Sequence, residues 1–169
     1  SPTVERDYEA YRLHDVWSMD GRRLDLMVCD TKGEFGPKGR VFRMWLYGVL
    51  EVRSRYFVGY SLGPELNSDA VRDALVNAFS NTRLIRPKEA QLDNGMEAAA
   101  KEITGGASWR RRGKVKDDEI IGLLPFLGIA VSWATPAHGQ TKPIERLFGT
   151  LAGMHETRPE FRGAYCGHK

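Results

Sequence analysis

Three acidic residues, Asp20, Asp93 and Glu145, stand where their side chains could serve as ligands of a cation. Asp20 directly follows an apolar segment typical of a strand, and Asp93 directly follows a second such segment, residues 89–92. Carboxylates at strand ends can converge at one edge of an α/β sheet, where the ligand sites of such sheets form. Asp-Gly and Asp-Asn-Gly are also common turn sequences, so a structural role for either aspartate is the alternative.

Glu145 belongs to the last helix that the sequence predicts. Apolar residues recur there at helical spacing, forming one stripe of Ile144, Leu147, Phe148 and Leu151. At about 100° per residue, Glu145 lies on the shoulder of this stripe, while Lys142 and Arg146 lie further round toward solvent. A carboxylate in that place stays near the protein body, where a bound cation would offset its desolvation. The alternative is an exposed glutamate paired with Arg146 or Lys142.

The first half of the chain is rich in strand patterns. Apolar residues at near-alternate positions over residues 16–30 predict two strands or one long bent strand. Residues 31–39 contain three glycines and a proline and predict a loop. Residues 40–51 and 56–62 predict a β-hairpin around a polar turn, packed on the first strand. Asn67 then supplies the N-cap of a helix.

The second half predicts alternating strands and helices. A short strand over residues 87–92 precedes a helix over 96–103, which stops at Gly105-Gly106. A helix over 117–127, a strand over 129–133 and a final helix from Lys142 to about Glu156 follow. The complete order predicts a mixed α/β fold, with an antiparallel three-strand meander followed by parallel crossovers.

Composition favours one compact domain. The 169 residues are 41% hydrophobic and 28% charged, which is close to the average for globular proteins. No apolar run approaches the length of a membrane span, and the N-terminus lacks the pattern of a signal peptide, so we expect an intracellular protein without a membrane partner. The two cysteines, Cys29 and Cys166, have no metal-site spacing and are expected to be reduced thiols.

Positive charge is concentrated in one segment. The net charge is only +3, but residues 109–116 hold five cations in eight residues. Such a run favours contact with nucleic acid, and a solvated loop is the alternative.

Four segments resemble the phage Mu transposase group. Residues 139–149, Gly-Gln-Thr-Lys-Pro-Ile-Glu-Arg-Leu-Phe-Gly, are similar to its last acidic motif and are the most specific part. Residues 92–95, with 101–106 downstream, resemble the middle motif, and 17–26 resemble the first. Residues 159–165 resemble the segment that closes the core in that group. The resemblance extends from about Tyr11 to the end of the chain.

The resemblance implies a ribonuclease-H-like fold with Asp20, Asp93 and Glu145 as an acidic triad of catalytic and metal-binding residues. It implies Mg²⁺, with Mn²⁺ as a substitute, and two ions when DNA is bound. The implied activity is nicking of DNA at element ends, followed by transfer of the 3′-hydroxyl into target DNA. Asp93 lies 73 residues after Asp20, and Glu145 lies 52 residues after Asp93. Asp25 and Asp30 compete for the first position, but Asp25 would lie opposite Asp20 only if the strand turned at Gly21.

The expected partners follow from this activity. DNA, both element ends and target, would contact the basic loop and the residues that flank Glu145, namely Arg110, Arg111, Arg112, Lys114, Lys116, His138, Gln140, Lys142 and Arg146. Trp109 would stack on an unpaired base or anchor the loop by packing. We expect a lead-in over residues 1–13 and a catalytic core over 14–169, part of a larger protein that assembles as a multimer on DNA.

An activator protein is a further expected partner, and the location would be the cytoplasm or nucleoid of a bacterium, with a phage as a possible source of the gene. Two other functions remain open at this stage. One is a structure-specific or RNA–DNA hybrid nuclease on the same fold, which shares the cleavage chemistry. The other is a catalytically silent module for DNA binding or assembly.

Overall fold

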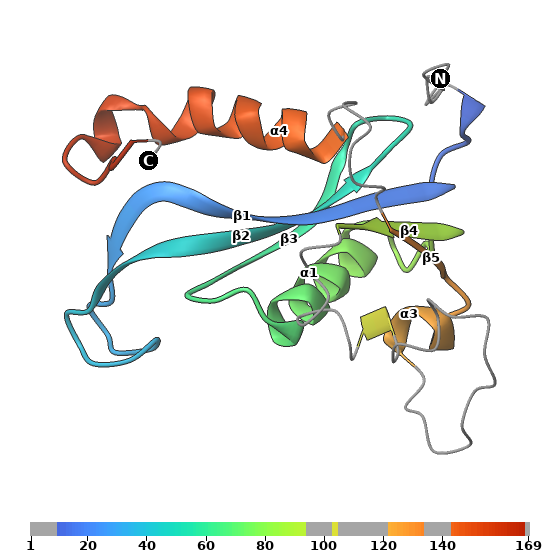
Figure 1. Cartoon of the computed structure of the whole chain (residues 1–169), viewed down its shortest axis with the longest axis horizontal. Coiled ribbons are helices and arrows are strands. Elements are labelled where there is room, and N and C mark those ends of the chain that lie inside the picture. Colours follow the sequence, from blue (N-terminus) through green and yellow to red (C-terminus); the bar gives the residue numbers. More distant parts are fainter. Residues whose placement is uncertain (1–9, 94–102, 105–121, 134–142, 168–169) are drawn as a thin grey trace.

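A computed structural model describes residues 10–93, 103–104, 122–133 and 143–167 (Figure 1). Its strands form one five-stranded sheet in the order β3-β2-β1-β4-β5. Their bounds are Val16–Cys29 (β1), Val41–Glu51 (β2), Phe57–Gly63 (β3), Glu89–Leu92 (β4) and Ala130–Trp133 (β5). The helices are α1 (Ser68–Asn81), α3 (Leu123–Phe126) and α4 (Pro143–Leu151), which continues into a π-helical turn (Ala152–Glu156) and a short 3₁₀ helix (Pro159–Phe161).

The pairing of the strands confirms the predicted sheet. β1 pairs with β2 and β2 with β3 in antiparallel fashion, whereas β1 pairs with β4 and β4 with β5 in parallel. This is the antiparallel meander followed by parallel crossovers of the ribonuclease-H-like class. The hairpin and the N-cap are confirmed as well, because the side chain of Asn67 accepts a 2.9 Å hydrogen bond from the backbone N–H of Ala70.

Helices cover both faces of the sheet. In Figure 1, α1 and α3 lie on one face and α4 runs along β1 on the other. The alternation of side chains along β1 divides its residues between two cores. Trp17 and Met19 are buried in the core beneath α1, so Ser18 and Asp20 face α4. The second core consists of Leu46, Leu50, Ile144 and Phe148.

Asp20 lies inside a strand and does not follow the end of one. β1 continues without a turn to Cys29, and Gly21 pairs with Tyr47 of β2. A Cβ atom at Gly21 would lie 2.7 Å from a methyl carbon of Leu66, so the glycine makes room for packing rather than for a turn. The open choice between two strands and one is settled in favour of one long strand, with a register shift between Arg23 and Met27.

The prediction of a continuous helix over residues 117–127 is also wrong. Gly122 is an N-cap with extended backbone (φ −64°, ψ 155°), and α3 begins only at Leu123. Pro125 fits this first turn because its missing N–H is not needed there. Residues 117–121 lie outside the described part, as do residues 1–9 of the lead-in predicted over 1–13 and most of the helix predicted over 96–103, of which Ile103 is helical and buried.

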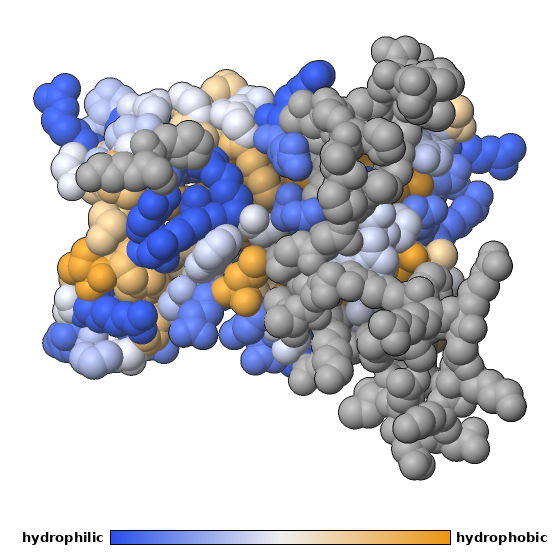
Figure 2. All heavy atoms as spheres, in the orientation of Figure 1, coloured by the Kyte–Doolittle hydropathy of each residue, from blue (hydrophilic) through white to orange (hydrophobic). Residues whose placement is uncertain are grey.

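The surface of the described residues is mixed. On the face shown in Figure 2, the apolar side chains that remain exposed form separate groups among hydrophilic ones. None of the described helices is long and apolar enough to cross a membrane. Cys29 and Cys166 are both free thiols.

Two carboxylates accept hydrogen bonds in turns, and their pKa values make the stability of the fold depend on pH. Burial alone would raise the pKa of Glu51, but hydrogen bonds from Ser54, Arg53 and His14 outweigh it and hold this pKa below its usual value. The backbone N–H of Phe35, 2.7 Å from the carboxylate of Asp30, lowers the pKa of that residue in the same way. A folded-state pKa below the unfolded one means that the stabilisation is present above the unfolded pKa and is lost as pH falls.

We therefore expect the free energy of unfolding, measured by urea denaturation, to fall as pH is lowered from about 5 to about 3. The variant Glu51→Gln keeps an acceptor oxygen for these donors and cannot ionise, so its stability should change less over the same pH range. An equally steep dependence in this variant would show that Glu51 does not contribute.

Candidate active site

The register of β1 on β4 relates two of the three predicted acids. Val16 pairs with Glu89, Trp17 with Ala90 and Ser18 with Gln91. Asp20 and Asp93 each stand two residues beyond the last of these pairs, Asp20 inside β1 and Asp93 directly after β4. Residues in corresponding positions of parallel strands face the same side of a sheet, so a continuation of this register predicts that both carboxylates face α4.

Asp20 occupies a partly buried place inside β1. Its carboxylate accepts a 2.7 Å hydrogen bond from the N–H of Gly21. Burial raises the pKa of the neighbouring Tyr47 far above its ordinary value, and the negative charge of Asp20 raises it further. The tyrosine therefore stays neutral, and the negative charge near this part of the sheet is that of the carboxylate.

α4 packs closely on the sheet beside Asp20 because the residue of β2 that pairs with Asp20 is a glycine. Gly48 pairs with Asp20, and a Cβ atom on it would lie 2.6 Å from the ring of Phe57 and 3.1 Å from the ring of Phe148. Phe148 thus fills the space over the backbone next to Asp20, and Ile144 is buried beside it. The predicted apolar stripe of the last helix is confirmed, since Leu147 and Leu151 pack against the same core.

Glu145 stands in the first turn of α4, three residues before Phe148, and is exposed. Its place on the helix is close to the predicted shoulder, but it is turned more toward solvent than the sequence suggested. The described residues contain no group of three or more His, Cys, Asp and Glu side chains gathered as metal ligands. Asp20, Asp93 and Glu145 therefore do not form a cluster of metal ligands in this conformation.

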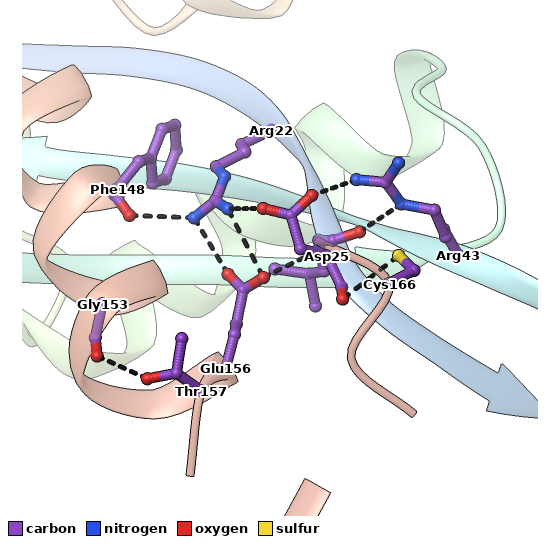
Figure 3. A network of polar contacts seen from close by, with 9 residues as sticks. Arg22, Asp25, Arg43, Phe148, Gly153, Glu156, Thr157 and Cys166 are labelled. Carbon is purple, nitrogen blue, oxygen red and sulfur yellow. Dashed lines mark hydrogen bonds and ion pairs between the residues drawn. The ribbon is translucent and has the colours of Figure 1, made fainter. Parts of the chain in front are cut away.

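A buried network of charges ties the end of α4 to β1 (Figure 3). The guanidinium of Arg22 donates to the carbonyl oxygen of Phe148 (2.9 Å) and forms ion pairs with Asp25 (2.8 Å) and Glu156 (2.9 Å). Asp25 also pairs with Arg43, and its backbone N–H donates to Glu156 over 2.6 Å. The two positive groups, Arg22 and Arg43, balance the two negative groups, Asp25 and Glu156.

These contacts decide between the candidates for the first acid. Both carboxylate oxygens of Asp25 bind guanidinium groups, and the residue is only 2% exposed. The carboxylate of Asp30 accepts backbone hydrogen bonds from the loop that follows it, including one from Gly33 at 2.6 Å. Asp25 and Asp30 therefore make structural contacts, and of the three candidates Asp20 is the one whose position along β1 corresponds to that of Asp93 in the register of β1 on β4.

The roles of Arg22, Arg43 and Glu156 were not predicted from the sequence. The only usable signal was the spacing of Arg22 and Asp25, three residues apart, which resembles an ordinary surface pair. Of the nine predicted DNA contacts, only Arg146 lies in the described part of the chain, where it is exposed on α4. The others, Arg110, Arg111, Arg112, Lys114, Lys116, His138, Gln140 and Lys142, lie outside it, as does Trp109.

A family model described as "Bacteriophage Mu transposase" matches residues 20–169, a range that includes all three acids. The chain belongs to this transposase family. It is 35% identical over 139 residues to "Mu-like prophage FluMu transposase A" of Haemophilus influenzae. That match covers 78% of the chain but 20% of the relative, so this transposase domain spans about a fifth of the length of that protein.

Among solved structures, the domain is similar to a chain of a simian T-cell lymphotropic virus intasome in complex with PP2A regulatory subunit B56 gamma. The sequence identity is 15% and the TM-score is 0.46. The match covers 93% of this chain and 48% of the other.

Proposed function

We propose that the chain is the catalytic core of a DNA transposase, which nicks DNA at the ends of an element and joins the freed 3′-hydroxyl to target DNA. Membership of the family supports this activity. The observation that supports it most is the parallel register of β1 on β4, whose continuation would bring the carboxylates of Asp20 and Asp93 to one face of the sheet.

Asp20 and Asp93 would hold divalent cations, with Glu145 as the third ligand. The donor set fits Mg²⁺ or Mn²⁺, because hard cations of this kind prefer carboxylate oxygens and keep part of their water shell. Two bound Mg²⁺ ions would activate the attacking oxygen and stabilise the leaving 3′ oxygen of the phosphodiester.

Repulsion between the acids would oppose their convergence in the absence of a cation. Two carboxylates about 4 Å apart repel each other by roughly 4 kcal/mol at an effective dielectric constant near 20. A third negative group at the same place adds to this repulsion unless positive charge is present. Glu145 lies at the start of α4 and is exposed, so a change of its rotamer would bring its carboxylate toward the proposed cations.

The surroundings of Glu145 would bind the DNA backbone. Arg146 is exposed next to it, and the sequence places further cations before α4 and in residues 109–116. Cations that contact phosphates release condensed counterions, so binding should weaken steeply as salt is raised. Recognition of element ends, assembly of several copies on DNA, help from an activator protein and a location at the nucleoid belong to this proposal as well.

A joining assay tests the proposal. The protein at its full natural length is incubated with a labelled duplex whose 3′ end is already cut and with an unlabelled target plasmid. With Mg²⁺ or Mn²⁺ we expect labelled target DNA, and with EDTA none. Cleavage by water without joining would favour a nuclease on the same fold. The absence of any reaction with either metal would favour a silent binding or assembly module.

A further inference from the structure

The charged network of Arg22, Asp25, Arg43 and Glu156 is more costly than an ordinary surface cluster. The side chains of Asp25 and Glu156 are only 4% and 5% exposed, and that of Arg22 is 13% exposed. Charges removed from water in this way are tolerated only when they are paired and hydrogen-bonded. Hydrophobic residues of similar size would fill the same space, so the arrangement calls for an explanation beyond packing.

Arg22 contacts three parts of the fold with one planar group. It binds Asp25 on β1, the carbonyl oxygen of Phe148 on α4 and Glu156 at the end of the π-helical turn. Arg22 also stands two residues after Asp20, so both side chains point to the same face of β1. The contact with Phe148 therefore links α4 to β1 two residues after Asp20.

The same contact sets the place of Glu145 along β1. Glu145 precedes Phe148 by three residues, which is about 4.5 Å along a helix axis. A slide of α4 along β1 would move Glu145 relative to Asp20 by the distance that the helix slides. A rotation of α4 would turn Glu145 toward β1 or away from it. Gly48 limits this motion sterically through Phe148, and Arg22 limits it through hydrogen bonding.

The π-helical turn brings Glu156 to Arg22. At about 100° per residue, eight residues of continuous α-helix would leave Glu156 about 80° round from Phe148, away from the sheet. The wider i→i+5 turn at Ala152–Glu156 rotates less per residue, and so Glu156 comes back to the sheet face. Its carboxylate there accepts the N–H of Asp25 over 2.6 Å.

The chain beyond this turn is fastened to the same stretch of β1. The backbone N–H of Cys166 donates to the carbonyl of Asp25 (2.9 Å), and that of Met27 donates to the carbonyl of Ala164 (2.8 Å). These bonds lie at the register shift between Arg23 and Met27. The C-terminal end of α4 is thus fixed from two directions, whereas Glu145 stands at the opposite end of the helix.

We propose that Arg22, held by Asp25 and Glu156, is the positioning residue for Glu145. It fixes the rotation and the axial position of α4 on β1 so that Glu145 reaches the cations held by Asp20 and Asp93. The inference rests on the proposed function. Arg22 does not contact the cations; it acts through α4, and the π-helical turn exists to complete its binding site.

The test measures how joining depends on metal concentration. Arg22→Lys keeps the charge but cannot bind three partners with one fork. We expect the half-saturating Mn²⁺ concentration of the full-length protein to rise by about 5-fold or more and the maximal rate to fall about 10-fold, since small misplacements of a catalytic group are costly. Glu156→Gln, which keeps an acceptor for Asp25, should shift the half-saturating concentration in the same direction.

Matched variants separate positioning from folding. Arg72→Lys changes an exposed pair at the same spacing, with Asp69 three residues away, and should leave both quantities unchanged. A variant that merely unfolds in part loses rate without a change in the half-saturating concentration. In a Glu145→Gln background, Arg22→Lys should cause no further shift.

The outcomes are distinguishable. An unchanged half-saturating concentration in both Arg22→Lys and Glu156→Gln, with an active parent protein, overturns the inference and leaves the proposed function standing. A parent protein that neither joins DNA nor binds Mn²⁺, as followed by the electron paramagnetic resonance signal of free Mn²⁺, overturns both.

Discussion

Asp93→Asn is expected to lower the rate of DNA joining by about 10³-fold or more while leaving the fold intact. Positioned cations stabilise the charge of the transition state by several kcal/mol, and each 1.4 kcal/mol corresponds to a factor of ten in rate. Asparagine at this position keeps the size of the side chain but removes one of the negatively charged ligands of the proposed metal site. The measurement is the joining assay under single-turnover conditions, at saturating Mg²⁺.

Asp20→Asn should have an effect of the same size, because Asp20 occupies the matching position on β1. Asp69→Asn is the control. The side chain of Asp69 is largely exposed on α1, where it forms an ion pair with Arg72. We expect its rate to stay within about twofold of the parent value, as exposed ion pairs contribute little. Joining by Asp93→Asn at near the parent rate would remove Asp93 from the metal site.

Thermal unfolding without metal gives an independent readout on the same variants. In the proposed site the carboxylates of Asp20 and Asp93 lie close together, so removing one charge should relieve repulsion. We expect the Tm of Asp93→Asn to equal or exceed that of the parent protein. A large fall in Tm would mean that the loss of activity reports unfolding instead of chemistry.

The position of the acidic pair was predictable in outline but not in detail. The spacing between Asp20 and Asp93 is 73 residues, and the register of β1 on β4 has the same offset, as Val16 pairs with Glu89. The strand patterns identified both strands, but register is a property of the folded sheet. The correspondence of the two aspartates therefore follows from the pairing, which ends two residues before each of them, and not from either local pattern.

Gly21 and Gly122 show how a local signal can mislead. Asp20-Gly21 is a common turn sequence and left open a division of the strand, whereas the glycine lies inside β1 and accommodates Leu66 from a segment 45 residues away in the chain. The apolar pattern of residues 117–127 concealed the extended backbone at Gly122, which immediately precedes α3. In both places a distant contact or a backbone angle decided the outcome, and neither is visible in a local window.

The helix that carries Glu145 was predicted well because its stripe is local, with all four apolar positions within two turns. The partner of its C-terminal extension was not predictable. Arg22 and Glu156 are 134 residues apart, and nothing in either neighbourhood indicates burial or pairing. Sequence patterns therefore locate the acids, whereas the network that orients them emerges only from the tertiary structure.

Removing Arg22 is expected to destabilise the protein strongly. In Arg22→Met, Asp25 keeps its ion pair with Arg43. Glu156 remains buried and keeps the hydrogen bond from the backbone N–H of Asp25, but it loses its ion pair with Arg22. A buried charge stripped of its partner costs about 3–5 kcal/mol, a large part of a typical stability of about 5–15 kcal/mol. Urea denaturation at pH 7 would measure the loss. Arg72→Met, at the exposed pair with Asp69, should cost less than about 1 kcal/mol.

The double variant Arg22→Met/Glu156→Gln identifies the cause of that loss. Glutamine removes the uncompensated charge and keeps an oxygen for the N–H of Asp25, so we expect about half of the lost stability to return. A double variant as unstable as the sum of the single ones would contradict this, because coupled charges must deviate from additivity. If Arg22 serves to position α4, the double variant should be folded and still require more Mn²⁺ than the parent protein, since restored charge balance cannot replace the bond from Arg22 to the carbonyl of Phe148.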